Sequence, residues 1–185
     1  MKRFLVPLLS AALLATLVVA GTLPRPAGEF SISTTAGKPV RLSQYKGKVV
    51  ALMFFLTYCS HCQKIAGFLA EDQKQYGLRG FQVLASAVEE GAAANVPGFL
   101  KKFNPPFPVG FNVRQPVVDF LQRPIADRLL MPQVVFIDRQ GVLREQYSGE
   151  SPFLDEAKAA QNLRAKIEEL LRPPAAPKKG PAKSN

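Results

Sequence analysis

The sequence has few of the side chains that build metal and haem sites: its 185 residues include one histidine, two cysteines and no tryptophan. A closed zinc site needs four ligands. Cys59, His61 and Cys62 supply three, so such a site would need added carboxylates or side chains from a partner. Covalent haem attachment requires histidine directly after a Cys-x-x-Cys motif, and Gln63 stands there. We therefore expect no metal, haem or other cofactor.

Acidic residues are also scarce, with 14 Asp and Glu against 24 Lys and Arg and a formal net charge of +10. Five of the basic residues lie near the chain ends, which carry no acid: Lys2, Arg3, Lys178, Lys179 and Lys183. The remaining body carries about +5, without the clustering on one face that nucleic-acid binding requires. We therefore expect no nucleic-acid partner.

Residues 1–23 have the order of a secretory signal, in which basic residues precede an apolar run and a helix-breaking segment. The run over residues 4–20 is also nearly long enough to span a bilayer as an uncleaved anchor. Both alternatives predict an exported protein, periplasmic or membrane-anchored and facing the extracytoplasmic side.

The other end, residues 173–185, is rich in proline and lysine and has no large apolar side chain. Such a segment cannot offset the entropy of its own ordering, which favours a disordered tail; the alternative is a basic tail that contacts anionic lipid or an acidic partner. Residues 24–172 are then one domain of ordinary size.

The middle of the chain alternates between strand and helix patterns. Residues 30–42 predict a short hairpin that turns at Gly37. Residues 49–56 form a continuous apolar run, typical of a central parallel strand. A helix from the cysteine pair to Tyr76 and a strand over residues 81–88 complete a right-handed crossover with parallel strands. The cysteine pair therefore lies at the carboxyl end of a strand.

The second half is less regular, with a short helix over residues 96–103, a Pro-broken strand over 107–113 and a helical turn over 117–121. Residues 134–137 and 142–147 flank a turn and predict a hairpin that closes the sheet edge. A last helix is expected to begin at Ser151-Pro152, with Asp155 and Glu156 in its first turns, and to end before Pro173. These patterns predict an α/β fold.

The chemistry lies in the motif Cys59-Ser60-His61-Cys62. As a structural crosslink, a disulfide that closes so small a ring would stabilise the fold by only about 2 kcal/mol. A redox role therefore explains the spacing of the two cysteines better. At the start of a helix, free backbone N–H groups and the helix dipole favour the thiolate of the first cysteine. We expect Cys59 to be the nucleophile and Cys62 the resolving thiol, joined in a redox-active disulfide.

The chain resembles the thioredoxin superfamily, in particular its exported TlpA and ResA branch of redoxin-like proteins. Residues 37–42, 45–50, 59–62, 107–109, 131–138 and Gly141 carry this resemblance. It implies a thioredoxin fold, a central mixed β-sheet flanked by helices, with an N-terminal β-hairpin and an insertion before the strand that follows a cis-proline. It also implies an enzyme that exchanges electrons with protein thiols and disulfides outside the cytoplasm.

The resemblance assigns further residues to the site. Pro132 matches the cis-proline, and the backbone of Met131 would pair with a substrate strand; the alternative is a trans proline that starts an edge strand. Tyr58 replaces the usual tryptophan before the first cysteine and would pack on the substrate. Met53 replaces the acid often found beneath the pair, so proton transfer from Cys62 would need water or Glu89 or Glu90.

His61 is shared with exported oxidases of the DsbA type, where histidine precedes the second cysteine. It can stabilise the Cys59 thiolate and raise the reduction potential; the alternative is an exposed histidine with little electronic effect. The principal hypothesis is a TlpA/ResA-like reductase. A DsbA-like disulfide donor or isomerase and a copper chaperone of thioredoxin fold remain alternatives. A peroxiredoxin does not fit, because its motif needs Thr or Ser three residues before the first cysteine and this chain has Leu56 there. A monomer served by a membrane electron donor or acceptor is expected.

Overall fold

A computed structural model describes residues 22–124 and 128–173. The predicted leader, apart from its last two residues, and the predicted tail, apart from Pro173, lie outside the described residues. No helix within the described ranges is long and apolar enough to cross a membrane.

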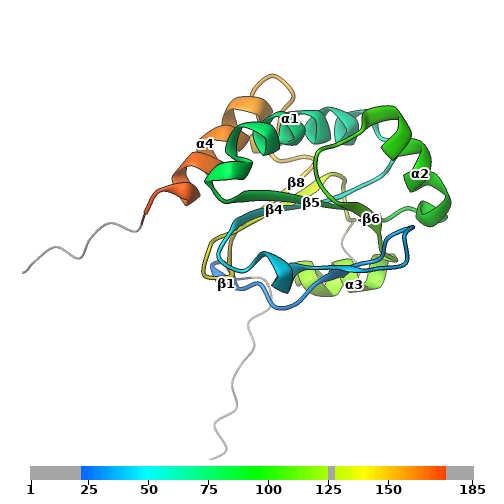
Figure 1. The fold of residues 1–185 in the computed structure, drawn as a ribbon, viewed down its shortest axis with the longest axis horizontal. Helices are drawn as coiled ribbons and strands as arrows, with labels where there is room; N and C mark the ends of the chain where they lie inside the picture. Colours follow the sequence, from blue (N-terminus) through cyan, green and yellow to red (C-terminus); the bar gives the residue numbers. More distant parts are fainter. Residues whose placement is uncertain (1–21, 125–127, 174–185) are drawn as a thin grey trace, which may run out of the picture.

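A six-stranded mixed sheet with the order β1-β8-β7-β4-β5-β6 forms the centre of the molecule (Figure 1). Its strands β4, β5 and β6 run parallel, whereas β7 is antiparallel to β4 and β8 to β7. The bounds are Arg25–Pro26 (β1), Val49–Phe55 (β4), Phe81–Ala87 (β5), Val109–Phe111 (β6), Gln133–Ile137 (β7) and Val142–Ser148 (β8). The expected α/β class and mixed sheet are confirmed.

Helices cover both faces of this sheet, as Figure 1 shows. On one face lie α1 (Ser60–Tyr76), α2 (Ala92–Phe103) and α4 (Ala159–Leu171). On the other lie α3 (Arg114–Leu121) and the short hairpin of β2 (Ser31–Ile32) and β3 (Val40–Arg41). The predicted N-terminal hairpin is therefore present, and Gly37 in its turn has a φ of 79°.

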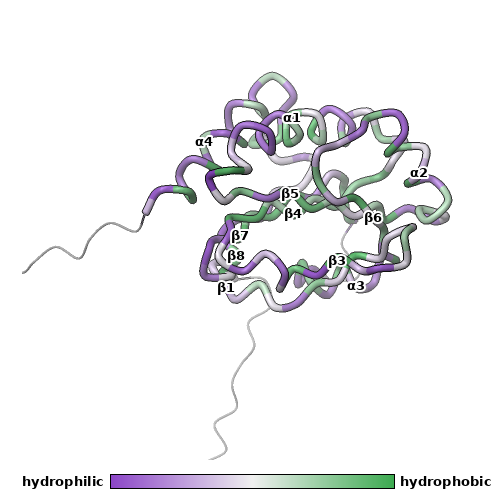
Figure 2. The backbone as a smooth tube through the Cα atoms, viewed as in Figure 1, coloured by the Kyte–Doolittle hydropathy of each residue, from purple (hydrophilic) through white to green (hydrophobic). Residues whose placement is uncertain are grey.

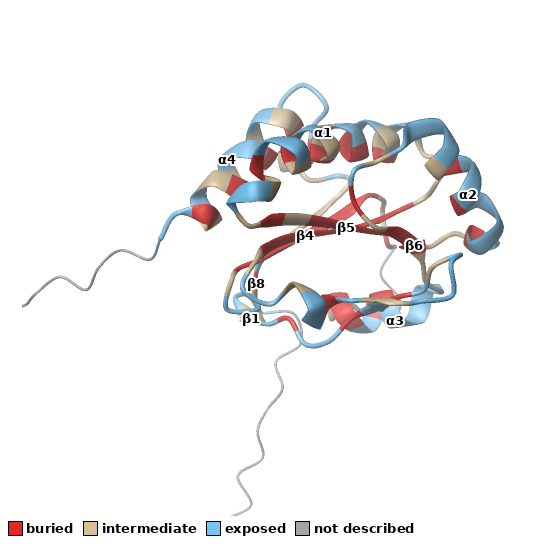
Figure 3. Cartoon of the chain, viewed as in Figure 1, coloured by how far each residue is buried: buried red, intermediate tan, exposed pale blue. Residues whose placement is uncertain are grey.

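The strand β4 divides the core because all seven of its residues are buried. Alternate side chains of a strand point to opposite faces, so Met53 and Phe55 pack under α1, whereas Leu52 and Phe54 pack toward α3. Figure 2 shows hydrophobic residues concentrated along the central strands, and Figure 3 shows the buried sides of α1 and α4 turned toward the sheet. Full burial of a Leu, Met or Phe side chain such as these stabilises the folded state by about 1.5–3 kcal/mol.

The β7–β8 hairpin does not close the sheet, and that expectation was wrong. The short strand β1 lies outside β8, with Arg25 opposite Leu143. The backbone N–H of Ala27 also donates to the carbonyl of Gly141 at 2.9 Å. Two residues are too few to show a strand pattern in the sequence.

The helices differ from their predicted bounds for local reasons. The second helix begins at Ala92 rather than at residue 96, since its first turn is made of small residues without an apolar period. At Ser151-Pro152 only a 3-10 turn forms, η3 (Pro152–Leu154). The backbone of Asp155 is not helical, and α4 begins at Ala159, so Asp155 and Glu156 do not lie in its first turn.

Candidate active site

Cys59 occupies the position that the sequence predicts, between the end of β4 and the start of α1. It is the N-cap residue of α1, with an extended backbone, and its Sγ accepts a hydrogen bond from the backbone N–H of Cys62 at 3.2 Å. The side chain is half-buried, and both cysteines are free thiols. An N–H donor and the positive end of a helix dipole stabilise a thiolate, so Cys59 is placed to attack a disulfide.

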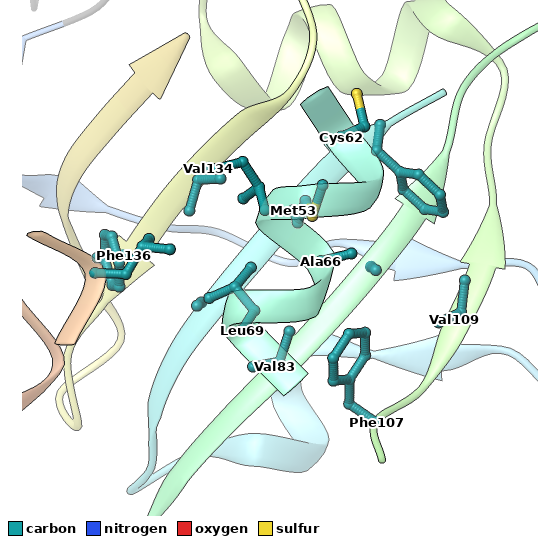
Figure 4. Packing of buried hydrophobic residues seen from close by; sticks show 14 of the residues in the cluster. Met53, Cys62, Ala66, Leu69, Val83, Phe107, Val109, Val134 and Phe136 are labelled. Atoms are coloured by element: carbon teal, nitrogen blue, oxygen red, sulfur yellow. The ribbon is translucent and has the colours of Figure 1, made fainter. Parts of the chain in front are cut away.

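Cys62 lies deeper, at the start of α1 over the strand that carries Met53 (Figure 4). It is fully buried in the apolar cluster between the sheet and α1. Burial and the hydrogen bond with the Cys59 sulfur raise the pKa of the Cys62 thiol far above its ordinary value. Cys62 therefore keeps its proton in the dithiol form, and its predicted role as the resolving thiol stays a prediction.

The carboxylate of Glu89 holds the backbone in front of Cys59. It accepts hydrogen bonds from the backbone N–H of Thr57 at 3.3 Å, from the Thr57 hydroxyl and from Asn95 Nδ2 at 3.4 Å. The amide of Gln63 in turn donates to the Thr57 carbonyl at 2.8 Å. Glu89 thus fixes the loop that carries the nucleophile, while its proposed role as a proton acceptor stays a prediction.

His61 is tied to the segment before α4. Its Nε2 donates a hydrogen bond to the backbone carbonyl of Leu154 at 2.8 Å, and Lys64 one turn later pairs with Glu156. The Nε2–H group is therefore engaged with Leu154 rather than with the sulfur of Cys59. Among residues 22–124 and 128–173, no group of three or more His, Cys, Asp or Glu is placed to hold a metal ion.

The other predicted residues gather around the same end of the sheet. Tyr58 is 70% exposed beside the nucleophile. The pairing of Phe54 with Gln133 sets the start of β7 beside the carboxyl end of β4, and the Met131–Pro132 peptide bond before β7 is cis. Met131 is half-buried and, like Cys59, packs against the cluster that contains Cys62.

Gly149, directly after β8, lies against the Met131–Pro132 peptide, a contact that sequence reasoning missed. A Cβ atom at this position would lie 2.4 Å from the carbonyl oxygen of Met131 and 3.1 Å from the nitrogen of Pro132. Only glycine allows β8 to approach the Met131–Pro132 peptide so closely. In the sequence, Gly149 follows a predicted strand and resembles an ordinary turn glycine, so only its position at the strand end could have pointed to it.

Comparisons with known proteins agree with this geometry. Over 93 residues, the chain is 34% identical to the thiol-disulfide oxidoreductase ResA of Bacillus subtilis (strain 168), a match that covers 50% of this chain and 51% of that relative. The chain thus spans about half the length of this relative. A second ResA, from Bacillus thuringiensis subsp. konkukian (strain 97-27), is 26% identical over 126 residues, covering 68% of this chain and 69% of the relative.

Solved structures show the same fold. A putative thiol:disulfide interchange protein DsbE from Chlorobium tepidum superposes with a TM-score of 0.64 at 26% identity, over 78% of this chain and 96% of that one. A thioredoxin family protein from Chlorobium tepidum TLS gives 0.67 at 25% identity, over 83% and 100%. Fold, cysteine pair and relatives together define a thioredoxin-fold protein of the thiol-disulfide oxidoreductase class, which confirms the predicted class.

The family itself follows from a match over most of the chain. The Redoxin family profile matches residues 21–163. The chain belongs to the Redoxin family.

Proposed function

We propose that the protein is an exported reductase of protein disulfides, with Cys59 as nucleophile and Cys62 as resolving thiol. The observation that carries this proposal is the asymmetry of the pair. The half-exposed Cys59 sulfur accepts the N–H of Cys62 at the start of α1, whereas the Cys62 thiol is buried beneath it. The Cys59 thiol can reach a substrate, whereas the Cys62 thiol can reach only Cys59.

The reaction proceeds by two exchanges. The Cys59 thiolate attacks one sulfur of a substrate disulfide, so a mixed disulfide forms, the substrate S–S bond breaks, and the departing thiolate takes a proton. Cys62 then loses its proton to water and attacks the Cys59 sulfur. The Cys59–Cys62 disulfide forms and the second substrate thiolate leaves and is protonated. Starting from the Cys59 thiolate, the protein gives up two electrons and the Cys62 proton, and solvent supplies the second proton that the two substrate thiols gain.

Tyr58, Met131 and Pro132 position the substrate in this scheme. The exposed Tyr58 ring offers an apolar surface beside the nucleophile. The Met131 backbone lies just before β7, beside the carboxyl end of β4, where an extended substrate segment can pair with it.

The hydrogen bond of His61 supports the reductase over a DsbA-like donor. An oxidising disulfide requires a strongly stabilised Cys59 thiolate. The Nε2–H group of His61 is used on the carbonyl of Leu154 instead, which limits what the imidazole contributes to the sulfur.

Export and the partners rest on the sequence. The basic, apolar and breaker order of residues 1–23 supports export, whether the leader is cleaved or retained as an anchor. A reductase outside the cytoplasm needs electrons from across the membrane, so a membrane dithiol donor would regenerate the reduced pair. The protein would act as a monomer and without a cofactor.

Trapping variants test the proposal. Cys62→Ser should accumulate mixed disulfides with protein substrates, because nothing resolves the bond to Cys59. Cys59→Ser should accumulate none, because Cys62 is buried. Non-reducing gels and mass spectrometry measure the mixed disulfides of both variants. Accumulation in Cys59→Ser but not in Cys62→Ser would reject the assignment of the two thiols.

A further inference from the structure

A groove of about 480 Å³ opens directly beside the nucleophile, between the start of α1 and the outer side of α2. Its lining joins three segments: the loop before the nucleophile with Tyr58, the first turn of α1 with Gln63, and the side of α2 that carries Gly98, Lys102 and Phe103. Because Tyr58 precedes Cys59 in the chain, a peptide whose sulfur reaches Cys59 would pass the mouth of this groove. It lies on the β5 side of the nucleophile, whereas Met131 and Pro132 lie on the β7 side.

Aromatic rings form one wall of the groove. Phe99 packs on the buried ring of Phe55 with centroids 4.9 Å apart, and Phe103 packs on Phe99 at 4.8 Å. The outermost ring, Phe103, remains 38% exposed, and Tyr58 is 70% exposed. Large exposed aromatic side chains that share a groove beside a reactive group are typical of a recognition surface.

The remaining lining is polar and carries a positive charge. Lys102 lies over the Phe103 ring, with its Nζ 4.8 Å from the ring centroid, and its side chain is exposed. The carboxylate of Glu89 does not line the groove and accepts hydrogen bonds from two residues that do, Thr57 and Asn95, whereas Lys102 is the charged residue of the lining. Lys102 is therefore the charge that a ligand in the groove meets.

We propose that this groove selects protein substrates that carry an aromatic or large apolar side chain and a carboxylate next to the cysteine to be reduced. The apolar side chain would pack against Phe103 and Tyr58, and the carboxylate would pair with Lys102. This inference rests on the proposed reductase function and adds the class of substrate segment that the reductase prefers.

Gly98 offers a way to test the groove without disturbing the fold. It lies on the exposed side of α2, in the groove lining, and a Cβ atom there would have no heavy atom within 4 Å. Gly67, on the exposed side of α1, is equally open and lies outside the groove. Gly98→Glu places a carboxylate in the groove, and Gly67→Glu adds the same charge elsewhere. Lys102→Glu and Lys101→Glu form a second matched pair, since Lys101 does not line the groove.

The experiment measures single-turnover reduction of two disulfide-linked peptides by the reduced full chain. One peptide has Phe and Asp beside its cysteine, the other Ser and Lys. We expect the first to react faster and the ratio of the two rate constants to fall about two- to fivefold in Gly98→Glu and Lys102→Glu, the range of an exposed ion pair. The ratio should change less in Gly67→Glu and Lys101→Glu.

The outcomes separate the two proposals. Equal rates for both peptides, or ratios that change alike in the groove variants and their controls, would overturn the groove while leaving the reductase intact. Failure of the reduced protein to reduce either peptide, or glutathione disulfide as a small disulfide, would overturn the reductase itself.

Discussion

The backbone N–H of Cys62 donates a hydrogen bond to the Sγ of Cys59 across 3.2 Å, so the two cysteines of one helical turn lie in unlike environments. The first accepts this bond at the helix N-cap and is half-exposed. The second is buried against the sheet. The proposal that Cys59 attacks the substrate and Cys62 resolves the mixed disulfide rests on this difference.

Alkylation should therefore be selective. In the reduced native protein at neutral pH, iodoacetamide should modify Cys59 at least about tenfold faster than Cys62, because burial raises the pKa of the Cys62 thiol and one pKa unit changes the thiolate fraction tenfold. Peptide mass spectrometry over time measures the two rates. In denaturant the rates should converge, and faster modification of Cys62 in the native protein would contradict the assignment.

The sequence predicted this part of the site because its determinants are local. Consecutive residues determine the apolar run of β4, the cysteine spacing and the helix that follows. The position of Cys59 at the helix start could therefore be predicted from the sequence. The hydrogen bond from His61 to Leu154 joins residues 93 positions apart. A hydrophobic periodicity in the sequence does not reveal a contact between residues so far apart. The pairing of β1 with β8 and the contact of Gly149 with Met131 are also long-range or depend on a single residue, so the sequence did not predict them.

Asp72 should make stability depend on pH. It is buried between α1 and α4, with Oδ1 3.6 Å from Nε of Arg164, and burial raises its pKa to about 6 although Arg164 opposes the shift. Between about pH 4, where the unfolded carboxyl titrates, and pH 6, the folded protein keeps a proton that the unfolded chain loses. The free energy of unfolding should therefore fall as pH rises through this window.

Asp72→Asn should remove this slope and raise the free energy of unfolding at pH 7 by about 1–2 kcal/mol. Urea denaturation at pH 4, 5, 6 and 7 measures it. Glu150→Gln, at an exposed position that does not contribute to the Asp72 shift, is the control and should keep the slope. A slope that persists in Asp72→Asn would assign it to another group.

Gly149→Ala should disturb the Met131–Pro132 peptide, because the added Cβ would lie 2.4 Å from the Met131 carbonyl oxygen. Overpacking of this kind costs about 1–3 kcal/mol, and the peptide-disulfide reduction rate should fall because the substrate-pairing backbone moves. Gly67→Ala is the control: its Cβ meets open space in a helix, so stability should rise by about 0.5–1 kcal/mol. A Gly149→Ala protein with unchanged stability and rate would show that the close approach has no role.

His61→Pro should make the disulfide more reducing, but by less than about 30 mV, which corresponds to about 1.4 kcal/mol. The effect is limited because the imidazole is engaged with the carbonyl of Leu154. Proline is tolerated in the first turn of a helix, so α1 should persist. Glutathione equilibria of the variant and the native protein give the difference. A larger shift would mean that His61 acts strongly on the Cys59 sulfur.

The central claim, that this Redoxin-family protein is a reductase, is tested most directly by the reduction potential of the Cys59–Cys62 pair. The protein is equilibrated with glutathione buffers of known potential, and the fraction of disulfide is read by thiol alkylation and mass. The account predicts a value near or below about −250 mV, in the range of thioredoxin-like reductants. A value near about −150 mV would contradict it and indicate a disulfide donor or isomerase instead.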